Sequence, residues 1–335
     1  MSKQSVRKQW IDFLRGIAML LVIWGHIAPE QDLFFVITSP FKIPLFFAIT
    51  GYVFNDRNGD WKIFGKKLFF SIIIPWLVLS LVWARALSAI VHNDVTRIPV
   101  LFYNLVSGKT LWFMPCIIVA ETIQFFIRWL LKTKRDRYIA MVVAAAIGLF
   151  LGRRGMARFA LLDVALVSQA FMLFGLWYKD HEQWLAEKLG LRVQAAGLAL
   201  YVLLIAVSIF AYPGRSLDVH MNEYYNYLIC GAMIFLSLLL LFLFFSGRRS
   251  LPRWIVFVGQ NTLAFYMLHG FVRSAFAKCL SVLGIRRQPM ILWEGIEMVA
   301  VCASVSVLAL IINRWLPFIA GKQRRLRVYH NQRLR

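Results

Sequence analysis

Charged residues are scarce in this sequence: only 16% of its 335 residues are Asp, Glu, Lys or Arg, whereas 60% are hydrophobic. An average soluble domain is about one quarter charged and less than half apolar, so this composition excludes a soluble fold. Apolar runs of about 18 or more residues recur along the chain, and each is long enough to cross a membrane as a helix. We therefore expect an all-α, polytopic membrane protein that forms a single domain over residues 1–335, with a short basic tail from about residue 320.

Several chemical motifs are also missing. The sequence has no GxSxG turn, no HExxH helix and no cysteine beside a placed base, so nothing favours an acyl-enzyme or zinc mechanism. Its four cysteines form no CxxC pair, which predicts neither a disulfide framework nor a metal site. The net charge of +22 lies in short tracts between apolar runs and comes with no nucleic-acid motif. We expect no bound cofactor, no metal and no nucleic acid.

Charge clusters and turn residues divide the chain into about ten expected spans. The first run lacks a small-residue cleavage site, so we interpret it as a retained helix. Most Lys and Arg fall between spans on one side, which by the positive-inside rule places both termini in the cytoplasm, although residues 153–158 and 286–287 come out external. Residues 181–192 predict a separate short helix on the cytoplasmic surface. The expected spans are residues 11–29, 33–54, 65–91, 110–131, 138–152, 158–178, 193–212, 224–246, 254–272 and 290–316.

Ionisable residues inside such spans are the best pointers to function, because an isolated charge in lipid costs several kcal/mol. In the first span, Asp12, Arg15 and His26 share one helix face. Arg15 and His26 differ by only about 20° around the helix and by roughly 16 Å along it. Asp12 is positioned to neutralise and aim the Arg15 guanidinium. Arg15 then lies near the cytoplasmic end of the span and His26 lies deep.

Three residues on different spans are expected at a similar depth in the outer half of the membrane: His26, Lys42 and His269. The estimate follows from a rise of about 1.5 Å per residue along each helix. Each residue also has a structural interpretation. The histidines could hydrogen-bond to a neighbouring helix, and Lys42 could form an ion pair.

A polar stripe on the ninth span leads to His269. Thr262, Tyr266 and His269 have the spacing i, i+4, i+7, and Asn261 is displaced from that face. Glu121 and Asp163 lie within other spans, where either could instead be a buried partner for Lys or Arg.

A neutral imidazole in a dry site can accept a proton from an alcohol during acyl transfer. An Arg at the cytoplasmic end can hold a phosphate or carboxylate while the reacting end of the ligand extends up the same helix face. This arrangement favours direct transfer between two bound substrates.

At these residues the sequence resembles the membrane-bound acyltransferase-3 family. The signature of that family is an Arg or Lys followed by ten residues and then a His. Arg15 and His26 match this signature. Further matches resemble the branch of fucose 4-O-acetylase-like proteins that acylate surface polysaccharides. The matching segments are residues 10–18, 22–26, 43–52, 111–115 and 261–269.

The resemblance implies a bundle of roughly ten helices in the bacterial inner membrane. It implies O-acylation of an envelope carbohydrate with acetyl-CoA or a related acyl-CoA as co-substrate. It gives His26 an essential role as general base, with Arg15 assisting acyl-CoA binding. Membrane lipids and a lipid-linked glycan or polysaccharide are the other expected partners.

Relatives commonly carry His where this chain has Lys42, which leaves open an acceptor other than the familiar sugars. A Lys could bind an acceptor carboxylate or the developing oxyanion. Proton-coupled, glycan or lipid transport is the alternative function, although the chain shows no inverted repeat. A non-catalytic scaffold is a third. The candidate substrate-binding residues are Lys42, Trp112, Glu121, Asp163, Asn261, Tyr266 and His269; the candidate catalytic ones are His26, Arg15 and Asp12.

Overall fold

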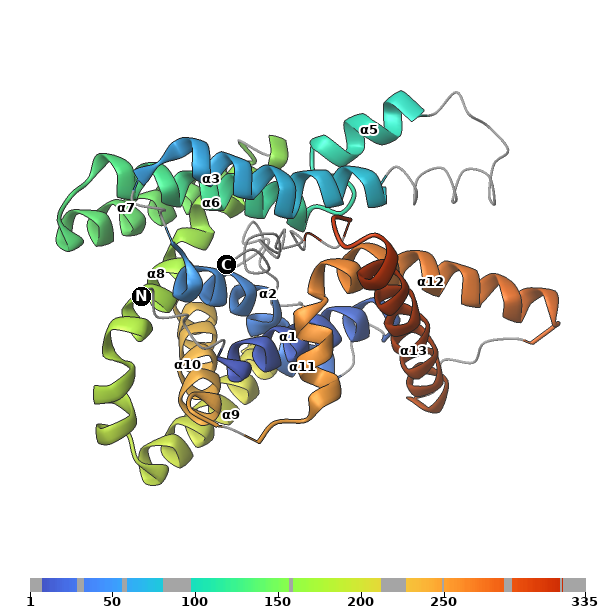
Figure 1. Ribbon diagram of the computed structural model, residues 1–335. Helices are drawn as coiled ribbons and strands as arrows, with labels where there is room; N and C mark the ends of the chain where they lie inside the picture. Colours follow the sequence, from blue (N-terminus) through green and yellow to red (C-terminus); the bar gives the residue numbers. More distant parts are fainter. Residues whose placement is uncertain are drawn as a thin grey trace, which may run out of the picture.

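The computed structural model describes residues 8–28, 33–55, 59–80, 98–156, 159–211, 227–248, 250–285, 291–319 and 321, and within these ranges every regular element is helical (Figure 1). The expected all-α fold is confirmed. The helices are α1 (Gln9–Ile27), α2 (Leu33–Val53), α3 (Trp61–Leu68), α5 (Ile98–Val106), α6 (Phe113–Leu130), α7 (Lys134–Arg153), α8 (Leu162–Lys188), α9 (Leu191–Ala211), α10 (Tyr227–Phe245), α11 (Arg253–Gln260), α12 (Thr262–Val282) and α13 (Ile291–Trp315).

The described helical segments include five that are long and apolar enough to cross a membrane, and a sixth if α11 and α12 count as one bent span. One of the five begins as α3 and continues through a π-helical turn at Phe69–Ile73 to Ser80. Most helix ends agree with the expected spans within a few residues. The count of ten spans and the cytoplasmic termini stay predictions.

The separate surface helix expected over residues 181–192 is wrong. Helix α8 continues without interruption to Lys188, and α9 begins at Leu191. The buried side chain of Leu185 ties this last part of α8 to the core. Residues 176–189 contain no Gly or Pro, and polar residues alone do not end the helix at residue 181.

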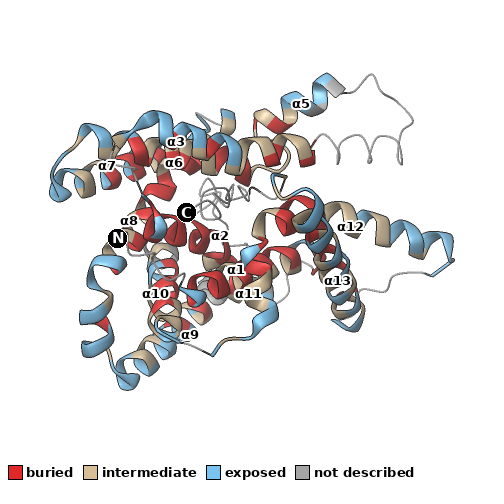
Figure 2. Cartoon of the chain, viewed as in Figure 1, coloured by how far each residue is buried: buried red, intermediate tan, exposed pale blue. Residues whose placement is uncertain are grey.

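The centre of the molecule is built on α1, α2 and α8, whose buried faces are drawn in red in Figure 2. Helix α2 packs along α8 at two reciprocal glycines. A Cβ atom at Gly51 would overlap the carbonyl oxygen of Met172, and a Cβ atom at Gly175 would overlap that of Ala48. The two backbones therefore approach each other more closely than any larger residue would allow.

Helices α1 and α11 use the same arrangement. A Cβ atom at Gly16 would overlap the carbonyl oxygen of Ile255, and one at Gly259 would overlap that of Asp12. Helix α11 is thereby fixed against the helix that carries Asp12, Arg15 and His26.

The single span expected over residues 254–272 is broken. Helices α11 and α12 meet at 89°, with Asn261 at the corner. Its side-chain amide donates to the carbonyl of Phe257 at 2.8 Å, and the hydroxyl of Thr262 donates to the carbonyl of Gly259 at 2.6 Å. The Phe257 carbonyl also accepts from the backbone N–H of Asn261 at 3.1 Å, and the Gly259 carbonyl has the Thr262 hydroxyl as a donor at the break, which makes the corner tolerable in an apolar environment.

The corner is tied to α13, because Asn313 donates from Nδ2 to Oδ1 of Asn261 at 2.6 Å. We expect Asn261→Leu to lower the free energy of unfolding by about 1–3 kcal/mol, since it removes buried hydrogen bonds. Thermal unfolding of Asn261→Leu, Asn313→Leu and the double variant checks this. The double variant should lose less stability than the two single losses added together. Strict additivity would contradict the proposed coupling of the corner to α13.

Candidate active site

A cavity of about 500 Å³ opens between α1, α2, α12 and the segment that leads into α6. This volume is typical of sites for small molecules. Its wall includes six side chains that can bind or react: His26, Lys42, Trp112, Tyr266, His269 and Arg273. The cavity therefore brings together His26, Lys42 and His269, the three residues expected at one depth.

The two histidines lie face to face. Their ring centroids are 5.1 Å apart, and the ring planes are inclined by 27°. His26 occupies the last turn of α1, which ends where the N–H of Ala28 donates to the carbonyl of Trp24. The side chain of His26 is exposed at the cavity, whereas His269 is buried. Because the rings stack face to face, their nitrogen atoms do not point at each other. The ring nitrogens of His26 can therefore face a ligand in the cavity.

The orientation of His269 follows from one hydrogen bond. Its Nδ1 lies 3.0 Å from the carbonyl oxygen of Phe265. A carbonyl oxygen only accepts, so Nδ1 carries the proton, and in the neutral ring Nε2 carries the lone pair. His269 is thus held with a fixed tautomer next to His26.

Tyr266 is positioned by the start of α6. The backbone N–H of Phe113 donates to the Tyr266 hydroxyl oxygen at 3.2 Å, and the Phe113 ring packs on Phe46 and Phe47 of α2. The Tyr266 O–H keeps its own proton for donation. The neighbouring Leu111 has a φ of 49°, a left-handed conformation that is costly for a non-glycine residue.

Two positive side chains face the cavity. Lys42 donates to the hydroxyl of Ser39 at 3.2 Å, and it lies between Pro40 and Pro44 within α2. Arg273 pairs with Glu297 of α13 at 2.8 Å. Both cations lie within electrostatic range of His26. Among the described residues that line this cavity there is no Asp or Glu, and Glu297, which balances the charge of Arg273, lies outside the lining.

A family model described as an acyltransferase domain, that of the acyltransferase-3 family, matches residues 8–314. The chain belongs to the acyltransferase-3 family. Together with its apolar helices, this makes the chain a multi-pass membrane acyltransferase and does not favour the transport alternative. No curated protein and no solved structure matches the chain.

The acyltransferase places its other expected catalytic residues away from the cavity. Asp12 is buried and accepts a hydrogen bond at 3.3 Å from Gln260 of α11. Arg15 and Lys67 both act electrostatically on Glu121, which is buried in α6. Arg15 therefore faces a second polar region, about 16 Å along α1 from His26.

Three of the expected substrate-binding residues do not line the cavity. Asn261 forms the corner between α11 and α12, and Asp163 is buried in the first turn of α8. Glu121 Oε2 and Asp163 Oδ1 have no hydrogen-bond partner among the described residues. Their roles, like those of all the site residues named from the sequence, stay predictions.

Arg273 is a cavity residue that was not predicted from the sequence. It continues the stripe of Thr262, Tyr266 and His269 by one further turn, at i+11 from Thr262, and this spacing could have identified it. The expected span ended at residue 272, one position before it. Within the described part of the acyltransferase, no group of three or more His, Cys, Asp or Glu residues could hold a metal ion.

Proposed function

We propose that this membrane protein transfers an acetyl or other short acyl group from acyl-CoA to a hydroxyl of an anionic envelope carbohydrate. The surface-polysaccharide O-acetyltransferase branch of the family and the bacterial inner membrane are part of this proposal. The observation that carries it is the cavity in which an exposed His26 stacks on His269 beside Lys42 and Arg273. An imidazole with access to a ligand is what an alcohol needs to become a nucleophile at neutral pH.

The proposed reaction is a direct transfer. His26 takes the proton of the acceptor hydroxyl as its oxygen attacks the carbonyl carbon of the thioester. A carbon–oxygen bond forms, and the carbonyl oxygen becomes an oxyanion. When the oxyanion collapses, the carbon–sulfur bond breaks and the electron pair stays on sulfur. The proton held by His26 passes to the thiolate, which leaves as the thiol of CoA.

Stabilisation of the oxyanion is assigned to Tyr266 or Lys42. The Tyr266 hydroxyl already accepts from the Phe113 N–H, so it is fixed in place and can donate to a developing negative charge. Trp112 adds an aromatic wall to the cavity, T-shaped against Phe113 at 6.0 Å. An apolar wall of this kind suits the face of a sugar ring or an acyl chain.

The test is acyl transfer from labelled acetyl-CoA. Membranes that contain the native protein are compared with membranes that contain His26→Ala and with membranes that lack the protein. Label that enters the envelope glycan fraction with the native protein alone supports the proposal, and mass analysis of the product identifies the acceptor. Label that enters equally with His26→Ala would contradict the role of His26.

Recognition of a negative acceptor predicts a selective defect in Lys42→Gln. We expect kcat/KM for an acidic acceptor to fall by about tenfold or more, because a hydrogen bond to a charged group is lost. The loss should be much smaller for a neutral acceptor with the same hydroxyl. Steady-state kinetics with the two acceptors measures it. The matched control is Lys278→Gln, an exposed lysine on α12 that does not line the cavity.

Equal losses of kcat/KM with the acidic and neutral acceptors would show that Lys42 does not distinguish charged from neutral acceptors. A loss of the same size in Lys278→Gln would show a general effect of removing one positive charge from the protein.

A further inference from the structure

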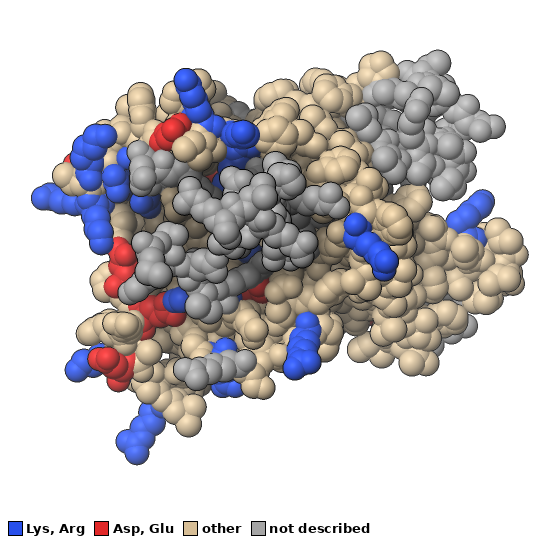
Figure 3. All heavy atoms as spheres, in the orientation of Figure 1, with Lys and Arg blue, Asp and Glu red and all other residues tan. Residues whose placement is uncertain are grey.

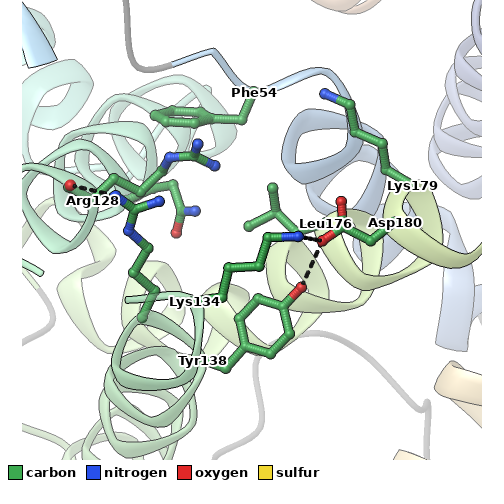
Figure 4. A pocket seen from close by; sticks show the side chains of 9 residues that line it. Phe54, Arg128, Lys134, Tyr138, Leu176, Lys179 and Asp180 are labelled. Carbon is green, nitrogen blue, oxygen red and sulfur yellow. Dashed lines mark hydrogen bonds and ion pairs between the residues drawn. The ribbon is translucent and has the colours of Figure 1, made fainter. Parts of the chain in front are cut away.

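A second pocket, of about 140 Å³, lies where the C-terminal ends of α2 and α6 meet α7 and α8 (Figure 4). We refer to it as the basic pocket. Its wall carries the polar side chains of Gln124, Arg128, Lys134, Arg137, Tyr138, Lys179 and Asp180. Lys and Arg side chains gather on this part of the molecular surface, at the left of Figure 3.

The charges of the basic pocket do not cancel. Asp180 is its one acid among the described lining residues, and the same carboxylate oxygen of Asp180 accepts from Lys134 at 3.0 Å and from Tyr138 at 3.3 Å (Figure 4). Lys134 therefore balances Asp180. The positive side chains of Arg137 and Lys179 line the same small volume together with Arg128, and the described lining holds no second acid.

The two arginines are held in place by the surrounding chain. Arg137 donates from Nε to the carbonyl of Leu131 at 2.8 Å and from Nη2 to the carbonyl of Arg128 at 3.3 Å. These bonds use two of the five N–H donors of its guanidinium. The guanidinium of Arg128 lies over the ring of Phe54, 5.7 Å from its centroid. Each guanidinium is thus oriented before any ligand arrives, which lowers the entropic cost of binding.

Gln124 supplies an independent observation. Its side chain is fully buried at 0% exposure, yet neither Nε2 nor Oε1 has a hydrogen-bond partner among the described residues. An unpartnered buried amide is costly, and native proteins rarely keep one without a ligand or water to satisfy it. Because Gln124 lines the basic pocket, its N–H groups can donate to a ligand there.

We propose that the basic pocket binds a phosphoryl group. A single carboxylate would be satisfied by one arginine, whereas a wall with several cationic side chains and an amide donor matches the charge and the several acceptor oxygens of a phosphate. Sites for whole drug-sized ligands measure about 300–1,000 Å³, so this pocket takes one charged group of a larger molecule.

Two sources share this chemistry: a phosphate of the acyl-CoA donor and the head group of an anionic phospholipid. Binding of an acyl-CoA phosphate here rests on the proposed function, and it agrees with the direction and length of α6. Phe113 at its start lines the cavity that holds His26, and Gln124, eleven residues later, lines the basic pocket about 16 Å away. The linear pantetheine arm of acyl-CoA is an extended chain suited to such a separation. The phosphoryl site itself does not depend on acyl transfer.

Binding measurements on the purified, full-length protein test the site without an activity assay. The probes are CoA, dephospho-CoA and nanodiscs of neutral lipid with or without phosphatidylglycerol. The variants are Arg128→Gln/Lys179→Gln and Gln124→Leu. The control is Lys188→Gln, an exposed lysine at the end of α8 that does not line the pocket.

If the donor supplies the phosphate, CoA affinity should fall more than tenfold in the double variant and about fivefold in Gln124→Leu. A lost preference for CoA over dephospho-CoA would assign the site to the 3′-phosphate. If a lipid supplies it, retention of phosphatidylglycerol, measured by native mass spectrometry, should fall instead.

Gln124→Leu keeps the test independent of misfolding, because removing an unpartnered amide should preserve or raise the Tm while phosphate binding falls. The proposal is overturned if CoA affinity and phosphatidylglycerol retention in both pocket variants equal those of Lys188→Gln. Failure of acyl transfer with intact phosphate binding would reject the proposed function and leave the basic pocket standing.

Discussion

Replacing His26 with Gln is expected to lower the rate of acyl transfer by about 10²- to 10⁴-fold, the range that general bases contribute. Gln keeps a polar side chain of similar reach at the end of α1, but its amide cannot accept the proton of an acceptor hydroxyl. Of the two stacked histidines, His26 is the one exposed at the cavity, so its imidazole is the one that a ligand can reach. The loss should therefore appear in kcat, with acyl-CoA affinity close to native.

Purified protein and single-turnover kinetics separate these effects. The control is His181→Gln, because His181 is exposed on α8 and is not part of the cavity wall. As the pH is lowered, the native rate should fall because the imidazole becomes protonated and only the neutral ring can take a proton. The residual rate of His26→Gln should lack this dependence. A variant that retains more than half of the native rate would remove His26 from the chemistry.

Replacing Gly175 with Val is expected to prevent assembly of α2 against α8. Even a Cβ atom at this position overlaps the backbone carbonyl of Ala48, and a backbone atom in a packed helix cannot move aside alone. Overpacking typically costs about 1–3 kcal/mol when side chains can adjust. Here the helices themselves must separate, so Gly175→Ala should cost at least this much and Gly175→Val should yield little folded protein.

Fluorescence-detected size-exclusion chromatography and Tm measurements check this expectation. Gly231→Ala is the control, because Gly231 is also a helical glycine and a Cβ atom there meets open space. That change should be neutral or raise stability by up to about 1 kcal/mol, owing to the better helix propensity of Ala. Equal Tm values for Gly175→Ala and Gly231→Ala would show that the close approach of α2 and α8 does not limit stability.

Most helices could be predicted from apolar runs, because a helix that crosses a membrane needs about 20 consecutive apolar residues and such runs are visible in the sequence. The corner at Asn261 could not be found in this way. The residues that flank the short polar stretch Gln260–Asn261–Thr262 are mostly apolar, and Asn is not a strong helix breaker, so the sequence predicts one continuous span. The corner depends on Thr262 and on Asn313, which is 52 residues away along the chain. Such a contact exists only after the helices have packed.

The candidate site was predictable where residues share a helix face or a depth. The spacing of Tyr266 and His269 and the rise along the helices were sufficient to bring them near His26 and Lys42. Polarity alone was less informative. Glu121, Asp163 and Asn261 are as polar as the cavity residues, but the helix face on which each lies directs it elsewhere. The sequence places Gln124 beside Glu121 near the middle of its span but assigns it to no site, because the missing hydrogen-bond partners of a buried amide are visible only in the structure.

The right-angled corner between α11 and α12 separates two rigid segments, and each segment supports a different part of the cavity. Helix α11 packs closely against α1 at Gly16 and Gly259, so α11 and the helix that ends in His26 form one rigid unit. Helix α12 turns away and presents Tyr266, His269 and Arg273 to the same cavity. If His26 is the general base and α12 contacts the acceptor, as we propose, substitutions along α12 can change acceptor selectivity without moving the end of α1. Proton transfer and acceptor recognition would then depend on separate rigid segments of the chain.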